Sequence, residues 1–179
     1  MGTIKIPIPV KLVCAITFVP CVNYESLIVE LESVLGRIDF RSEIFDFEHT
    51  CYYEEEMGSQ LKKQYVSFAA LIPAEWLPSI KIRTNLLEKR FMNDPKRMVN
   101  IDPGYIEKAK LVLATTKNFS HRIYLGSGIF GDLQYRFRHK TFTCNEWTYP
   151  DYREGAVIAF FNRIREKYCS EVDTCQEDS

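Results

Sequence analysis

The sequence predicts an α+β protein, a single two-layer domain whose helices pack on a mostly antiparallel mixed sheet. Three observations lead to this class. The chain of 179 residues is long enough to bury one hydrophobic core without disulfide or metal staples. Several segments alternate apolar and polar residues with the period of a strand, whereas others repeat apolar residues with the period of a helix. Two strand-like segments also flank a glycine-rich turn, as in an antiparallel hairpin.

The first unit is a strand followed by a helix. Residues 10–18 alternate between a fully apolar face and a nearly apolar one, which predicts a central strand. Asn23 is a suitable N-cap for the following helix, whose apolar stripe starts at Leu27. Gly36 provides the signal that ends this helix.

The next segments predict two more strands and a helical region. Residues 38–47 predict a strand with a bulge or bend near residues 42–45, because the apolar residues change parity there. Residues 66–72 alternate as a further strand. Residues 73–91 predict one or two helices interrupted by Pro78.

The segment "NIDPGY", residues 100–105, predicts the start of a helix. Asp102 can cap it, and Pro103 suits the first helical position because the N–H that proline lacks would be unpaired there. The apolar residues that follow would form a buried stripe. Lys117 would then lie near the negative end of the helix dipole.

The segment "YLGSGIFGD", residues 124–132, contains Gly126, Gly128 and Gly131 in the spacing of a dinucleotide-binding turn. Such a turn requires the third glycine to lie in a helix whose N-terminus meets the pyrophosphate. Here both flanks alternate as strands. The sequence therefore predicts a β-hairpin, with the first two glycines in the turn and the third inside a strand.

The last element is a helix. Apolar residues at helical spacing from Val157 to Tyr168 form its buried face. The polar, acidic segment that follows predicts a frayed tail over residues 171–179. Residues 1–170 are thus expected to form one globular domain.

The net charge and the spacing of the cysteines indicate which binding partners and which cellular compartment to expect. The net charge of −1 provides no global field for nucleic acid or an anionic membrane, and neither is expected as a partner. None of the six cysteines forms a C-x-x-C pair, so we interpret them as reduced thiols. With no apolar stretch of about 18 residues, the expected location is cytoplasmic.

The sequence lacks the P-loop and the guanine-reading motif of conventional GTPases. No G-x-x-x-x-G-K-[ST] loop occurs, and Phe119 replaces the aspartate that would read a guanine base two residues after Lys117. A conventional GTPase is therefore not expected. His121 and Arg122 can instead place two donors on a phosphate or carboxylate, or one of them can turn inward to a carboxylate partner.

Two acidic segments leave alternatives open. In "CYYEEEMG", residues 51–58, Glu54 and Glu56 could hold Mg²⁺ together with a substrate phosphate, or the run can be the solvated first turn of a helix. The helix start expected at Asp102 to Gly104 could receive an anion, unless the Asp102 carboxylate already occupies its N–H groups.

The segment "WTYPDYR", residues 147–153, combines aromatic rings with an acid and a base. It could cover a ligand as a lid. Alternatively, its aromatic residues fix the loop to the core, and Asp151 caps a helix.

Taken together, "YYEEEMG", "RMVNIDPGYI", "HRIYLGSGI" and "WTYPDYR" resemble the bacterial domain of unknown function 4416 family, over about residues 9–168. Members of this family are often named GTP-binding proteins. The resemblance therefore implies a guanine nucleotide as a candidate ligand, and it implies no particular reaction or catalytic residue.

Our leading hypothesis is a protein that binds, or acts on, a small anionic molecule such as a nucleotide or phosphorylated metabolite. His121 would donate or accept a proton, and Asp102 or Glu55 would bind a metal or act as the base. The candidate ligand-binding residues are Asn100, Gly104, Tyr105, Lys110, Lys117, Arg122, Tyr149, Asp151 and Arg153. The alternative is a non-catalytic module for protein–protein interaction or self-association.

Overall fold

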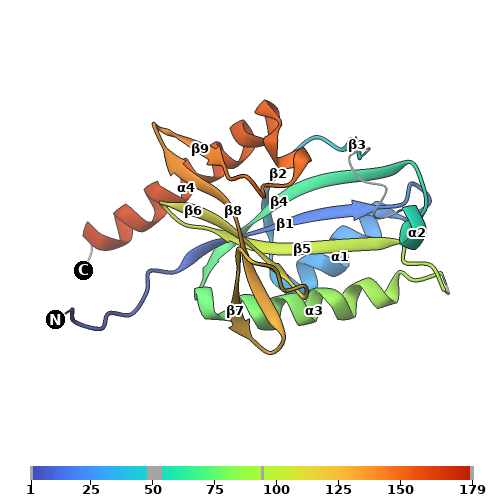
Figure 1. Ribbon diagram of the computed structural model, residues 1–179, viewed down its shortest axis with the longest axis horizontal. Helices are drawn as coiled ribbons and strands as arrows, with labels where there is room; N and C mark the ends of the chain where they lie inside the picture. The colour runs from blue at the N-terminus through green and yellow to red at the C-terminus, as the bar shows by residue number, and fades with distance from the viewer. Residues whose placement is uncertain (1, 48–53, 94, 178–179) are drawn as a thin grey trace.

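The computed structural model describes residues 2–47, 54–93 and 95–177, without the side chains of 54, 55 and 175–177. Figure 1 shows a single twisted sheet with helices on both of its faces. The strands are β1 Val10–Phe18, β2 Ile38–Arg41, β3 Phe45–Phe47, β4 Leu61–Ile72, β5 Val99–Ile106, β6 Lys110–Thr115, β7 Arg122–Gly126, β8 Ile129–Arg138 and β9 Thr141–Cys144. The helices are α1 Tyr24–Leu35, α2 Glu54–Met57, α3 Leu77–Arg90 and α4 Gly155–Glu177, with 3-10 turns η2 Ala74–Trp76 and η3 Pro150–Arg153. The predicted α+β class is confirmed.

The strands follow the order β2-β4-β1-β5-β6-β8-β7, with β3 beside β4 and β9 beside β8. All of these pairs are antiparallel. Helices α1 and α3 cover one face and α4 covers the other (Figure 1). The domain thus has three layers where the sequence predicts two, because β1 is buried on both faces.

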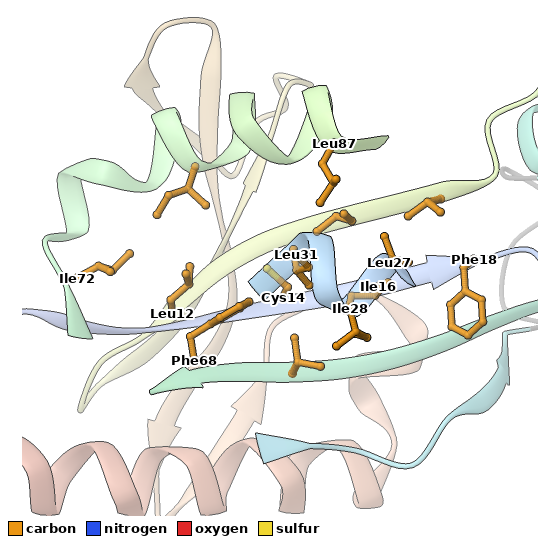
Figure 2. Packing of buried hydrophobic residues seen from close by; sticks show 14 of the residues in the cluster. Leu12, Cys14, Ile16, Phe18, Leu27, Ile28, Leu31, Phe68, Ile72 and Leu87 are labelled. Atoms are coloured by element: carbon orange, nitrogen blue, oxygen red, sulfur yellow. The ribbon is translucent and has the colours of Figure 1, made fainter. Parts of the chain in front are cut away.

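The core beneath α1 and α3 is mainly aliphatic. Figure 2 shows Ile16 of β1, Leu27 of α1 and Leu87 of α3 in the same buried layer. Complete burial of a side chain of this size stabilises the fold by about 1.5–3 kcal/mol. Cys14 lies in this layer as well, and burial raises the pKa of its thiol. This cysteine therefore serves as a core residue and not as a reactive thiol.

The core beneath α4 is rich in aromatic residues. Tyr65 of β4, Tyr135 of β8 and Tyr152 of η3 meet Phe161 of α4, whose ring stacks on that of Tyr152 at a centroid distance of 5.6 Å. The predicted C-terminal helix is confirmed. It continues to Glu177 and buries Val172, so it extends into the segment that the sequence predicts to be frayed.

The predicted unit of strand and helix at the N-terminus is confirmed. The side-chain oxygen of Asn23 accepts a hydrogen bond from the Ser26 N–H at 3.1 Å, and Gly36 follows the helix with a φ of 95°. The region from residue 38 to residue 47 forms β2 and β3, which both pair with β4. Pro78 lies in the first turn of α3 and does not interrupt it, since an N–H at that position needs no partner within the helix.

The predicted hairpin is also confirmed, since β7 and β8 are antiparallel neighbours. Gly126, Ser127 and Gly128 have φ values of 114°, 53° and 77°, and Gly131 lies inside β8. The three glycines therefore belong to a turn and a strand, and they form no nucleotide-binding loop.

The prediction that a helix begins after Asp102 is wrong. Residues 99–106 form β5, and β6 follows where the predicted helix would continue. β5 pairs with β1 along its whole length, from Val99 opposite Phe18 to Ile106 opposite Lys11. These long-range pairs outweigh the local capping signal, which is a weak determinant beside tertiary context.

Gly104 is required by the close approach of β5 to β6. A Cβ atom at this position would lie 2.4 Å from the Val112 carbonyl oxygen and 2.7 Å from Leu113 Cδ2. We expect Gly104→Ala to lower the free energy of unfolding by about 1–3 kcal/mol, measured by chemical denaturation. Gly155→Ala is the control, because a Cβ there meets no atom within 4 Å. Equal stability of the two variants would contradict this expectation.

A buried ion pair joins β1 to β2 and α4. Lys11 Nζ lies 2.7 Å from Asp39 Oδ2 and 3.2 Å from Glu171 Oε2, and the Ser67 hydroxyl donates to Asp39 Oδ1 at 2.6 Å. Burial alone would raise the pKa of Asp39, but the bonds from Lys11 and Ser67 outweigh it, and Lys167 adds to them. The pKa of this carboxyl therefore lies below its ordinary value.

This depressed pKa predicts a pH dependence of stability. Folding favours ionised Asp39, so its contribution is complete above the ordinary carboxyl pKa of about 3.9 and is lost as the pH falls through the lower folded value. We expect Asp39→Asn to be less stable than wild type at neutral pH. Below that range the two proteins should converge in unfolding free energy. Curves that stay parallel down to about pH 2 would argue against this role.

None of the helices in the described part of the chain combines the length and the apolar character that crossing a membrane requires. Cys14, Cys21, Cys144 and Cys169 are free thiols. Cys51 and the side chain of Cys175 lie outside the described residues.

Candidate functional site

The sheet opens between β5 and β6. These strands pair only where Gly104 to Ile106 lie opposite Leu111 to Leu113. Toward Val99, β5 keeps its pairing with β1, and none of the described strands pairs with its other side. The open edge faces a pocket, so its backbone groups need other partners.

Helix α3, which lies along β5 in Figure 1, and Arg97 supply those partners. The Ile101 N–H donates to Glu88 Oε1 at 2.7 Å, and the Ile101 carbonyl accepts from Lys81 Nζ at 2.7 Å. The Arg97 Nε donates to the Val99 carbonyl at 3.1 Å. Charged side chains thus take the hydrogen bonds that a neighbouring strand would otherwise make.

Pro103 contributes to the same opening. In an antiparallel sheet the backbone groups of every second residue point to the same side. Those of Ile101 point away from β1, toward α3, so the nitrogen of Pro103 lies on the open edge too. Proline has no N–H to pair, and it is tolerated in a strand at an unpaired edge. The "DP" dipeptide therefore marks the place where β5 leaves β6.

A pocket of about 600 Å³ occupies this opening, between α3, the open edge of β5, the end of β6 and the loop that contains η3. Its cationic lining residues are Lys63, Lys81, Lys89, Arg97, Lys117 and Arg122. Its carboxylates are Glu56, Glu88, Asp102 and Asp151. The pocket is therefore locally cationic, although the whole chain has a net charge of −1.

Two ion pairs with buried lysines form the floor of the pocket, and the first joins β4 to η3. Lys63 Nζ lies 2.6 Å from Asp151 Oδ2, and the Tyr65 hydroxyl donates to the same oxygen. The ammonium group also lies 4.4 Å from the centre of the Phe47 ring, which is a cation–π contact. Burial raises the pKa of Tyr65, so its hydroxyl remains a donor.

The second pair joins α3 to β5. Lys81 Nζ lies 3.0 Å from Asp102 Oδ1, and the Asn100 side chain donates to Asp102 Oδ2 at 2.7 Å. Burial alone would raise the pKa of Asp102, but Lys81, Lys63 and Asn100 outweigh it and lower the pKa. Asp102 is therefore an ionised acceptor. For Glu88 burial prevails over the nearby cations, and its pKa is raised.

The mouth of the pocket contains an arginine that its neighbours hold in place. Arg122 donates to Asp132 Oδ2 at 2.8 Å, to the Lys117 carbonyl at 3.0 Å and to the Tyr149 hydroxyl at 3.1 Å. Asp132 is buried on β8 and also accepts from Gln134 at 2.7 Å. A guanidinium has more N–H donors than these bonds use, so Arg122 can still donate to a ligand.

Lys117 adds a second cation to this corner. It follows β6 in the chain and lines the pocket with Arg122. Partial burial and the charge of Arg122 lower the pKa of Lys117. Two cations that repel each other gain when an anion binds between them, so the mouth favours an anionic group.

Comparison with known proteins assigns the family. Residues 8–168 match the model of the Domain of unknown function (DUF4416). The chain belongs to the DUF4416 family. The resemblance predicted from the sequence motifs is thereby confirmed for nearly the whole chain. No curated protein and no solved structure matches it.

Of the candidate site residues, the DUF4416 pocket brings six together. They are Asn100, Asp102, Lys117, Arg122, Tyr149 and Asp151. Asp102 caps no helix, and it lies in β5 with Lys81 and Asn100 as partners. Asp151 lies in η3, where its carboxylate pairs with Lys63 instead of capping a helix.

The other described candidates lie outside the pocket lining. His121 turns toward a carboxylate, with its Nε2 3.5 Å from Asp132 Oδ1, and its ring stacks on Trp147 at 4.8 Å. Lys110 pairs with Glu107 at 2.7 Å. Arg153 donates to the carbonyls of its own loop, at 2.7 Å for that of Glu146. Trp147 therefore packs on a side chain of the protein rather than covering the pocket.

Gly104 and Tyr105 serve the packing of β5, the glycine at the contact with β6 and the tyrosine beside the aliphatic core. The side chain of Glu55 lies outside the described residues. Among the residues that are described, His, Cys, Asp and Glu form no group of three or more that could hold a metal ion. A role for Mg²⁺ therefore stays a prediction.

Sequence reasoning missed the residues that α3 and β4 contribute. Lys81, Asn85 and Glu88 follow one another at helical spacing and line the pocket. A polar stripe of this kind on a helix that also has a buried apolar side was the available signal. Lys63 has a similar signal, since it is a charged residue inside a long strand that is otherwise mostly buried.

Proposed function

We propose that this DUF4416 protein binds, or acts as an enzyme on, a small phosphorylated metabolite in the opening between β5 and β6. The observation that supports this most strongly is the cationic corner of Arg122 and Lys117. A buried carboxylate, Asp132, fixes the arginine there. A guanidinium fixed in this way matches the oxygens of a phosphate through charge-assisted hydrogen bonds.

The size and the charge of the pocket support a small ligand. Its volume of about 600 Å³ is within the range of about 300–1,000 Å³ that is usual for small-molecule sites. Its cationic character is local, whereas a long polyanion would need a broad basic surface. GTP belongs among the ligands to test, because the resemblance in the sequence implies a guanine nucleotide as a candidate ligand.

One observation supports self-association as a second candidate function. β7 is the last strand of the sheet order, and it exposes Ile123 and Tyr124 to 72% and 61%. Exposed apolar side chains on an edge strand are a common site of strand pairing between molecules. Loss of self-association in Ile123→Ser, measured by size-exclusion chromatography with light scattering, would support this function.

Calorimetric titration tests the proposed function. Pyrophosphate, GTP and sugar phosphates are titrated into the wild type, Arg122→Gln and Arg136→Gln. The last variant is the control, because Arg136 is an exposed arginine of the neighbouring strand outside the pocket. We expect at least one compound to bind, with an affinity about tenfold lower in Arg122→Gln, which is a loss of about 1.4 kcal/mol.

The affinity should also fall with added salt, since the contact is ionic and partly exposed. Equal affinity of wild type and Arg122→Gln, or no binding by any phosphorylated compound, would reject the proposed function. An equal loss of affinity in Arg136→Gln would show that the effect is not specific to the pocket and would reject it as well.

A further inference from the structure

We propose that the ligand is a phosphorylated sugar or polyol whose hydroxyl groups occupy the floor of the pocket while its phosphate lies at the mouth. This inference rests on the proposed function. It starts from the contrast between the two ends of the pocket. The mouth has two cations, Arg122 and Lys117, with the Asp132 carboxylate beside the arginine, whereas the floor has one carboxylate for each of its two lysines.

The floor presents donors and acceptors side by side. Lys81 and Asn100 provide N–H donors, and Asp102 provides carboxylate oxygens, all within one hydrogen-bonded group. A hydroxyl group can donate and accept at the same time, so it suits such a surface. A second phosphate would gain little there, because Lys63 and Lys81 are already paired with Asp151 and Asp102. An apolar group would displace water from these polar atoms, and it could not replace the hydrogen bonds that the water makes.

Asp102 is the acceptor that a ligand can reach. Its side chain is 27% exposed, whereas that of Asp151 is 3% exposed. Each of its oxygens accepts one hydrogen bond, from Lys81 or from Asn100. A carboxylate has about four lone-pair sites, which leaves capacity for hydroxyl donors. Because the carboxylate stays ionised, it can only accept, which selects a ligand that donates.

The wall between the two ends suits a carbon chain. Leu113 and Ala114 of β6 line the pocket beside the place where β6 meets β5, and Thr115 and Thr116 continue this wall toward Lys117 at the mouth. A ligand that spans this wall would keep its phosphate near Lys117 and its hydroxyl groups near Asp102.

The aromatic rings favour a sugar over a nucleobase. Three aromatic residues line the pocket, Phe47, Tyr149 and Tyr152. The Phe47 ring already has the Lys63 ammonium over it at 4.4 Å, the Tyr152 ring stacks on Phe161, and the Tyr149 ring packs against Tyr152 at a steep angle. Trp147 stacks on His121, and neither ring lines the pocket. A nucleobase would seek a free aromatic face or an apolar slot, whereas hydroxyl groups find the floor described above.

Calorimetry with three probes, each of which carries one phosphate monoester group, tests the inference. Ribose 5-phosphate and glycerol 3-phosphate carry hydroxyl groups, and pentyl phosphate has the same number of carbons as ribose without them. We expect ribose 5-phosphate to bind the wild type about tenfold more tightly than pentyl phosphate, through hydrogen bonds to a charged group. In Asp102→Asn this preference should shrink to about twofold while the affinity for pentyl phosphate is kept.

Asp46→Asn is the matched control, because Asp46 is an exposed carboxylate that pairs with Lys62, and neither of them lines the pocket. It should leave the preference unchanged. The comparison of probes on the wild type needs no variant, so it decides the question even if Asp102→Asn fails to fold.

The outcomes separate the two proposals. Pentyl phosphate binding as tightly as both hydroxylated probes would overturn the sugar or polyol assignment. Suppose that pyrophosphate or GTP binds in a manner that depends on Arg122, while the protein binds the hydroxylated probes no more tightly than pentyl phosphate. This inference then fails and the proposed function stands. Failure of every phosphorylated compound to bind overturns both.

Discussion

Replacing Asp151 by asparagine is expected to lower the free energy of unfolding by about 3–5 kcal/mol. The carboxylate is buried between Lys63, at 2.6 Å, and the Tyr65 hydroxyl. Its loss leaves the ammonium group of Lys63 charged, buried and without its counter-ion. Uncompensated buried charges are among the most destabilising defects in a core. Urea unfolding at neutral pH measures the effect.

An exposed ion pair on the same strand provides the control. Lys62 Nζ also lies 2.6 Å from a carboxylate oxygen, that of Asp46, but these side chains are 37% and 66% exposed, against 7% and 3% for Lys63 and Asp151. We expect Asp46→Asn to cost less than about 1 kcal/mol. The double variant Lys63→Met, Asp151→Asn should lose much less than the sum of its single changes. Similar losses in Asp46→Asn and Asp151→Asn would contradict the role of burial.

Replacing Asp132 by asparagine should affect stability and ligand binding together. The Asp132 carboxylate is buried, and it accepts from Arg122 and Gln134, with His121 at 3.5 Å. An amide cannot neutralise Arg122, so we expect a loss of about 3 kcal/mol in unfolding free energy. Because Arg122 then loses the partner that positions it, the affinity for a phosphorylated ligand should fall by about tenfold.

Asp173→Asn is the control for this change, since Asp173 is an exposed carboxylate of α4 paired with Lys108. It should change neither quantity measurably. A variant Asp132→Asn that loses stability but keeps full ligand affinity would show that Asp132 supports the fold without positioning Arg122.

The parts of the fold that depend on local patterns could be predicted from the sequence. The β1–α1 unit, the β7–β8 hairpin and α4 each have periodic apolar residues with clear start or stop signals. β5 could not be predicted, because Asp102 and Pro103 have the local signature of a helix start. Only the pairing with β1, which is remote in sequence, makes this segment a strand.

The same limit applies to the site. Arg122 and Lys117 could be proposed from residue type and from their places at the ends of predicted elements. Lys63 and Lys81 could not, since their importance comes from burial beside Asp151 and Asp102, which only the tertiary structure creates. His121 was proposed for its chemistry, but its ring packs against Trp147 outside the pocket.

Mapping the binding site by nuclear magnetic resonance tests the central claim most directly. Pyrophosphate is titrated into ¹⁵N-labelled protein, and the shifts of the backbone amides are followed. If a phosphorylated ligand binds in the opening between β5 and β6, the largest changes will occur at Thr116, Lys117 and Arg122, which line its mouth. Changes concentrated instead around Arg41 and Arg163, which line a separate groove of about 520 Å³ beside α4, would contradict the claim.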